Sequence, residues 1–246
     1  MSGGGILITG ASAGIGWALA QALAAPGIAL GLTARRMERL ETLQQELEAR
    51  GAKVLIYKAD VRDADAMANV AEDFVKAAGG VKMVIANAGI SSGGRLEHGT
   101  AAPLNEVFAV NVMGVINTIA PFVPHMIRQR RGHLVAISSV AGFRGLPGRA
   151  DYNGSKAAVN TMMDGFRLEL KEHGISVTTI CPGFIESEMT QRNTFKMPFL
   201  LTADSAAQHI LKAIGRNKKS YVFPWQWRAL LPLVVRLPDW LMPRAR

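Results

Sequence analysis

Tyr152 and Lys156 are the two side chains whose types and spacing most directly suggest proton chemistry. They are four residues apart, so on a helix they share one face. A free phenol titrates near ~10, which is too high for efficient proton exchange at neutral pH. A neighbouring ammonium favours the phenolate and lowers that pKa. The pair therefore predicts a tyrosine that exchanges a proton with a substrate, with the lysine assisting its ionisation.

A serine hydroxyl is expected close to this pair. Ser138 and Ser139 follow the apolar run of residues 133–137, which predicts a buried strand that presents a hydroxyl at its carboxyl end. A Tyr-x-x-x-Lys spacing alone is a weak signal, because an exposed helical pair without a role has the same spacing. The other elements of the chain decide between these two interpretations.

A glycine-rich turn lies near the start of the chain, between a predicted strand at residues 6–8 and a helix that runs to about residue 25. Its sequence is Thr9-Gly10-Ala11-Ser12-Ala13-Gly14-Ile15-Gly16. A strand, a glycine-rich turn and a helix in this order place backbone N–H groups and a helix N-terminus against a phosphate. We expect Gly10 to allow the sharp turn, Gly14 to let the backbone approach the ligand, and Gly16 to let the helix lie close to the strand. The alternative is a plain flexible turn, which the flanking strand and helix disfavour.

The next strand, residues 28–33, ends in Ala34-Arg35-Arg36 and carries no acidic residue there. In dinucleotide folds that bind NAD, an acid at this place accepts a hydrogen bond from the ribose 2′-hydroxyl. Guanidinium groups instead bind a 2′-phosphate. The sequence therefore predicts NADP(H) rather than NAD(H) as the cofactor. Two solvated arginines at the start of a helix are the alternative.

Strands and helices alternate along most of the chain, which predicts an α/β, Rossmann-like doubly wound parallel sheet of about seven strands with helices on both faces. Ligands bind such sheets at the carboxyl ends of the strands. Five polar residues are expected on that one edge: Thr9, Arg35, Asp60, Asn87 and Ser139. We expect one dinucleotide-binding catalytic domain over residues 1–223, with a substrate lid at about 184–200. One long helix is expected over residues 103–130, bent or divided at its prolines.

Composition limits the class of protein. The chain has 246 residues and a single cysteine, Cys181, so an internal disulfide is excluded and a reducing, cytoplasmic compartment is expected. The five histidines show no metal-ligand spacing, so no metal is assigned. We expect no secretory signal and no transmembrane helix. The net charge of +9 favours anionic partners, but we find no nucleic-acid recognition module and expect no nucleic-acid partner.

Taken together and in order, the motifs from about residue 6 to 223 resemble the classical single-domain short-chain dehydrogenase/reductase family. They are Thr9-Gly10-x-x-x-Gly14-x-Gly16, Asp60-Val61, Asn87-Ala88-Gly89, Asn111, Ser139, Tyr152-x-x-x-Lys156 and Pro182-Gly183. The resemblance implies hydride transfer that interconverts a carbonyl and a secondary alcohol. It also implies a homodimer or homotetramer. A cofactor-binding regulator or scaffold without catalysis is the alternative, which the intact serine, tyrosine and lysine disfavour.

The resemblance also assigns site residues. The implied catalytic residues are Asn111, Ser139, Tyr152 and Lys156, with Asn111 holding a water for proton relay. The implied cofactor-binding residues are Gly10, Ser12, Gly14, Ile15, Gly16, Arg35, Arg36, Asp60, Val61, Asn87, Ala88, Gly89, Tyr152, Lys156, Pro182, Gly183, Ile185 and Ser187. Asp60 and Val61 are expected at the adenine and Asn87 along the adenosine ribose. Ser187 stands where the family usually has threonine, and its hydroxyl is expected to reach the nicotinamide amide.

The tail, residues 224–246, is apolar and basic and holds three of the four tryptophans. Packing against the domain or a subunit contact is the favoured interpretation. A peripheral membrane contact and a cover over the substrate cleft are the two others. The apolar tail, together with Phe184, Phe195, Met197 and Phe199 in the lid, suggests a lipophilic substrate.

Overall fold

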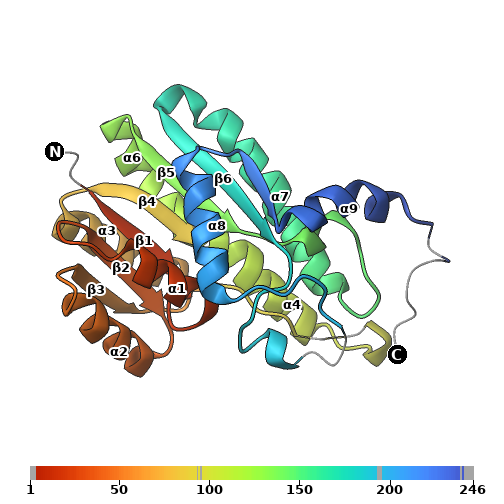
Figure 1. Ribbon diagram of the computed structural model, residues 1–246. Coiled ribbons are helices and arrows are strands. Elements are labelled where there is room, and N and C mark those ends of the chain that lie inside the picture. The colour runs from red at the N-terminus through yellow and green to blue at the C-terminus, as the bar shows by residue number, and fades with distance from the viewer. Residues whose placement is uncertain (1–3, 93, 95, 193–195, 239, 241–246) are drawn as a thin grey trace.

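The computed structural model describes residues 4–92, 94, 96–192, 196–238 and 240. In these residues one parallel sheet of seven strands forms the centre of the molecule, in the order β3-β2-β1-β4-β5-β6-β7 (Figure 1). The strands are β1 Gly5–Thr9, β2 Ala29–Ala34, β3 Lys53–Lys58, β4 Val81–Ala86, β5 Gly132–Ile137, β6 Ile175–Pro182 and β7 Ser220–Phe223. The predicted fold class is thereby confirmed.

Helices cover both faces of the sheet, as the nearly continuous apolar strands require. α1, α2 and α8 share one core with the sheet, and α3, α5, α6 and α7 share the other. The helices are α1 Gly14–Leu23, α2 Met37–Glu48, α3 Ala64–Ala78, α4 Ala102–Phe108, α5 Gly114–Ile119, α6 Val123–Gln129, α7 Ala150–Glu169, α8 Ala203–Gly215 and α9 Trp225–Arg236. α9 extends beyond the end of the sheet that carries β7 (Figure 1).

Local capping fixes where several helices begin and end. The Asp63 side chain accepts a hydrogen bond from the Ala66 N–H at the start of α3, and Gly79 ends that helix in the left-handed conformation, with φ of 68°. Thr202 caps α8 in the same way through the N–H of Ser205. These caps set the lengths of the helices between strands.

The long helix expected over residues 103–130 is present but irregular. A π-helical turn, Ala109–Met113, joins α4 to α5, and a 3₁₀ turn, Ala120–Phe122, joins α5 to α6. The 3₁₀ turn contains Pro121, one of the two prolines expected to divide the helix. The π turn was not predicted; such turns are frequent at functional sites.

Residues 102–129 meet the length and hydropathy of a membrane span. In the fold, however, this segment is a core helix, because Val110, Ile119 and Phe122 are buried with the side chains of the sheet. Its apolar composition is accounted for by that packing.

The end of the chain contains a helix that the sequence analysis did not predict. α9 follows β7 directly and forms three turns of helix. Phe195, residue 239 and residues 241–246 lie outside the described residues, so the expectations made for them are not examined in the structure.

Candidate active site

A cavity of about 690 Å³ lies along the carboxyl edge of the sheet. Every residue predicted for catalysis or cofactor binding lines it, except Gly16 and Asn111. Of the five polar residues expected on this edge, Thr9 is fully buried behind the cavity and the other four border it. The sequence therefore located the cavity, although it did not separate the residues that line it from those that support it.

The glycine-rich turn forms one end of the cavity. Gly10 has a φ of 66°, and a Cβ on Gly16 would lie 2.3 Å from the carbonyl oxygen of Gly10. A side chain at Gly16 would therefore push α1 away from the turn. The N-cap of α1, Ala13, makes no side-chain capping hydrogen bond, so the first N–H groups of α1 are left for a ligand. A small, uncapped helix N-terminus at the cavity wall fits the diphosphate of a dinucleotide.

Asn87 ties this turn to the end of β4. Its Nδ2 donates to the carbonyl oxygens of Thr9, at 3.0 Å, and of Gly10, at 3.2 Å. The Thr9 hydroxyl accepts from the backbone N–H groups of Asn87 and Ala88. These contacts fix the glycine-rich turn to the end of β4. The expected place of Asn87 along the adenosine ribose stays a prediction.

Asn111 supports the site from within the π turn. Its Oδ1 accepts from the Ile90 N–H at 2.8 Å, and its Nδ2 donates to the Ile90 carbonyl at 2.9 Å and the Ser155 hydroxyl at 3.0 Å. The fully buried side chain thus joins the loop after β4 to α7. Ser155 was not predicted, although it lies between Tyr152 and Lys156. The expected water-holding role of Asn111 stays a prediction.

Ser139 lies at the end of β5, as expected, and its position is set by a short 3₁₀ turn, Val140–Phe143. The Ser139 hydroxyl accepts from the Ala141 N–H at 3.1 Å. The preceding Ser138 donates to the Lys156 carbonyl at 3.1 Å, which fastens α7 to β5. The two serines therefore place the Ser139 hydroxyl, which was predicted to be catalytic, close to the helix that carries Tyr152.

Tyr152 titrates under three influences. Burial raises its pKa, whereas the hydrogen bond with Ser139 and the charge of Arg149 lower it. Burial is the largest influence and leaves the pKa of Tyr152 above its ordinary value. The sequence argument assigned the lowering to Lys156, whereas in the structure described the lowering groups are Ser139 and Arg149. The Lys156 ammonium donates to the Ile137 carbonyl at 2.8 Å and lies 5.7 Å from the centroid of the Tyr152 ring. Burial lowers its own pKa to about 8.

The two predicted arginines border the cavity near the end of β2, and Arg36 is held on both sides. Its Nε and Nη2 donate to the Ser12 hydroxyl at 3.2 and 3.1 Å, and its Nη1 donates to both carboxylate oxygens of Glu188 at 3.1 and 2.9 Å. Arg35 is more exposed and lies 3.9 Å from Asp60. Hydrogen bonds from Arg62 lower the pKa of Asp60. Glu188 was not predicted as a site residue.

Comparison with known proteins identifies the family. Residues 5–197 match the family model described as short chain dehydrogenase. The chain belongs to the short-chain dehydrogenase/reductase family. It is therefore an NAD(P)-dependent oxidoreductase with a Rossmann-like fold.

The similarity extends over nearly the whole dehydrogenase. An uncharacterized oxidoreductase of Myxococcus xanthus is 38% identical over 239 residues, which cover 97% of this chain and 94% of that protein. A solved short-chain dehydrogenase/reductase of Burkholderia phymatum in complex with NAD is 27% identical, with a TM-score of 0.85. The match covers 96% of this chain and 92% of that chain. A solved short-chain dehydrogenase of Sphingobium yanoikuyae in complex with NADPH is 27% identical, with a TM-score of 0.82. The match covers 96% of this chain and 97% of that chain.

Several cavity residues of the dehydrogenase escaped the sequence analysis. Arg149 precedes α7 and donates to the Ser91 hydroxyl at 2.9 Å, so its charge is fixed near Tyr152. Ser92, Met189 and Thr190 also line the cavity. Arg149 was identifiable by its place three residues before the tyrosine, whereas the others lie in loops whose course the sequence did not predict.

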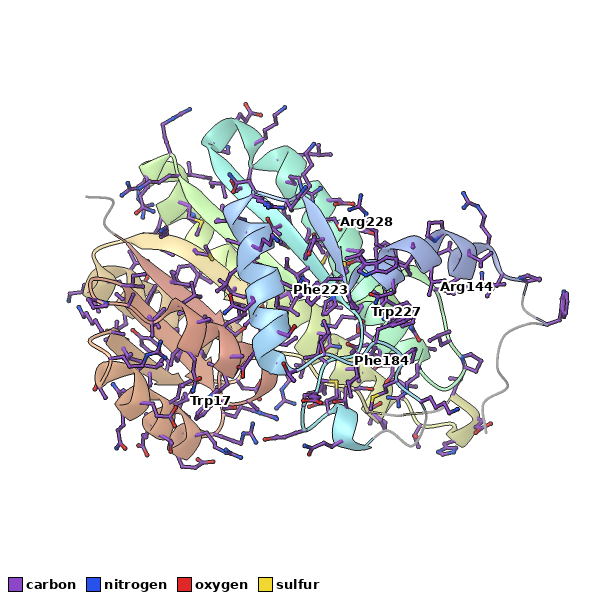
Figure 2. All side chains as sticks on the ribbon, in the orientation of Figure 1. Trp17, Arg144, Phe184, Phe223, Trp227 and Arg228 are labelled. Atoms are coloured by element: carbon purple, nitrogen blue, oxygen red, sulfur yellow. The ribbon has the colours of Figure 1, made fainter. Side chains whose placement is uncertain are left out.

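The tail of the dehydrogenase packs on the lid side of the cavity. Trp227 contacts Phe184 and Phe199 edge to face, with centroid distances of 5.9 and 6.1 Å, and Figure 2 shows Trp227 beside Phe184. At the other end of α9, Arg144 donates to the carbonyls of Val235 and Leu237, both at 3.1 Å. The inner side of α9 therefore packs against the domain, which was the favoured interpretation of the tail.

Proposed function

We propose that this dehydrogenase prefers NADP(H) to NAD(H) and interconverts a carbonyl and a secondary alcohol on a lipophilic small molecule. The observation that supports the proposal is that two groups of residues line the same cavity. One group is Ser139, Tyr152 and Lys156, and the other is Arg35 and Arg36. The first three residues suit proton exchange with a substrate oxygen. The two arginines suit a phosphate beside the adenosine ribose.

The cofactor would be held by groups of two kinds. The turn at Gly10 and the uncapped N-terminus of α1 suit the diphosphate, and Arg35 and Arg36 suit a 2′-phosphate. A bound nicotinamide dinucleotide supplies or accepts the hydride. Since one solved relative holds NAD and another NADPH, the preference for NADPH rests on the arginines and on the absence of an acid at the end of β2.

Tyr152 would give its phenolic proton to the substrate oxygen during reduction and recover it during oxidation. Ser139 would donate a hydrogen bond to the same oxygen, which stabilises the negative charge that develops there. The positive charge of Arg149 lowers the pKa of Tyr152, so the phenolate forms more readily. General acid catalysis of this kind contributes about two to four powers of ten in rate. Asn111 fixes the backbone of Ile90 through two hydrogen bonds. From this position it would support the predicted water-mediated relay of protons.

A lipophilic substrate is favoured by the aromatic side chains on the lid side. Phe184, Phe199 and Trp227 pack together next to Gly183, which lines the cavity. Met189 adds a flexible apolar side chain to the cavity wall. The aromatic side chains support this side from behind Gly183, and the apolar lining residues Val110 and Ile185 suit an apolar group attached to the reacting carbonyl.

The test is turnover of NADPH and NADH by the purified protein against a panel of ketones, aldehydes and quinones of increasing apolar size. We expect oxidation of NADPH with the more apolar compounds and a lower kcat/KM with NADH. Binding of NADPH without turnover across the panel would instead favour a cofactor-binding regulator. A homodimer or homotetramer and a cytoplasmic location stay predictions.

The cofactor preference has its own test. Replacing both Arg35 and Arg36 with alanine should weaken NADPH binding by about 10- to 100-fold, because hydrogen bonds to charged groups contribute ~1.5–3 kcal/mol. NADH binding should change much less. Arg39→Ala is the matched control, since Arg39 lies 3.7 Å from Glu188 but does not line the cavity. An equal loss for both cofactors in the double variant would contradict the assignment.

A further inference from the structure

Helix α9 has an inner apolar side that the domain covers. Leu231 is buried, and Trp227 lies so close to Gly183 that a Cβ on that glycine would be 2.3 Å from the indole Nε1. The helix also contacts β7 and the 3₁₀ turn after Ser139. These contacts hold α9 against the domain next to the cavity, and they fix which side of the helix faces away from the domain.

The outer side of α9 is also apolar, and nothing in the described residues covers it. Trp225 is 72% exposed and Leu233 is 62% exposed. Together with Ala229, they follow one another at intervals of four residues, so they lie along one side of the helix. Trp240, beyond the helix, is 81% exposed. Side chains of this size rarely gather on a surface without a binding partner.

The charges on this helix are all positive. Arg228 and Arg236 are exposed beside the apolar side chains, and the twelve residues of α9 include no acidic residue. Figure 2 shows Arg228 near the start of the helix. The chain as a whole carries a net charge of +9. The occupant of this surface must therefore combine an apolar region with negative charge.

We propose that the outer side of α9 docks on a lipid membrane with anionic headgroups. Tryptophan is favoured at the membrane–water boundary, and arginines beside it attract anionic headgroups. A second copy of the chain fits less well, because α9 carries no acidic residue with which a copy of this helix could pair Arg228 and Arg236. A membrane with anionic headgroups offers both an apolar region for Trp225 and Leu233 and negative charge for the arginines.

Docking in this way has a consequence for the cavity. α9 lies between the membrane and Gly183, so the cavity is separated from lipid by about one helix diameter, ~10 Å. The docking surface itself does not depend on the proposed reaction.

The experiment is sedimentation of the intact protein with vesicles of phosphatidylcholine, alone or mixed with phosphatidylserine, at low and high salt. We expect binding to the mixed vesicles at low salt, and weaker binding with phosphatidylcholine alone or at high salt. The double variant Trp225→Ser with Leu233→Ser should bind at least about tenfold more weakly, because burying each side chain contributes ~1.5–3 kcal/mol. Arg228→Gln with Arg236→Gln should reduce the dependence on phosphatidylserine.

Leu168→Ser is the matched control, because it removes a 76% exposed leucine on α7, away from α9. It should bind vesicles as the unaltered protein does, and all variants should keep the same NADPH affinity and unfolding temperature. Absence of binding to anionic vesicles at low salt would overturn the proposal, as would equal binding by the Trp225 and Leu233 double variant. Concentration-dependent dimers that this variant abolishes, without vesicle binding, would assign the surface to a subunit contact instead.

Discussion

Replacing Glu188 with glutamine should strengthen NADPH binding and leave NADH binding unchanged. The Glu188 carboxylate holds Arg36 through contacts of 2.9 and 3.1 Å between side chains that are 50% and 39% exposed. An ion pair exposed to this degree contributes ~0.2–1 kcal/mol, which a 2′-phosphate must displace before it binds Arg36 fully. The carboxylate also repels a phosphate a few ångströms away by about 1 kcal/mol. Together these terms predict a Kd for NADPH that is about five- to thirtyfold lower in the variant.

The assay is a titration of each cofactor by calorimetry at two salt concentrations. Glu186→Gln is the matched control, since Glu186 is exposed in the same segment but does not line the cavity. It should change the Kd for NADPH by less than about twofold, because in the described residues the partner of Arg36 is Glu188 and not Glu186. Equal tightening of NADPH and NADH, or the same gain in the Glu186 variant, would refute the reasoning.

Two further predictions concern the scaffold. Burial lowers the pKa of His133 to about 4, so the side chain is neutral in the folded state at neutral pH. In the unfolded chain it takes up a proton near its ordinary pKa of about 6.5. The free energy of unfolding should therefore fall by up to about 3 kcal/mol as pH falls from about 6.5 through 4. His133→Gln should flatten that loss in denaturant titrations at pH values across this range, and an unchanged slope would contradict the assignment. Gly183→Ala should cost about 1–3 kcal/mol through collision with Trp227. The cost should shrink in a Trp227→Leu background, whereas additive changes in unfolding free energy would exclude the contact.

The parts of the fold predicted from the sequence are those with local signals. The turn from Thr9 to Gly16 joins a strand to a helix within a few residues, and Tyr152 and Lys156 are neighbours on one helix. Periodic apolar runs and glycines determine such features without reference to the rest of the chain. The sheet and the cavity edge followed from the alternation of these elements.

The parts that the sequence did not predict depend on distant pairs. Glu188 meets Arg36 across 152 positions of sequence, and Arg144 reaches Val235 across 91. The π turn at Asn111 depends on hydrogen bonds to Ile90, whose loop has no regular pattern. No local propensity carries information about such contacts, since they exist only when packing brings the segments together.

The central claim is that the Tyr152 hydroxyl supplies the proton to a substrate oxygen beside the bound cofactor. Tyr152→Phe removes that hydroxyl and keeps the ring. With a substrate found in the carbonyl panel, the variant should bind NADPH with a Kd within about twofold of the unaltered protein, since the other cavity residues are unchanged. Its turnover should fall by about two to four powers of ten. Near-normal turnover by Tyr152→Phe would contradict the account.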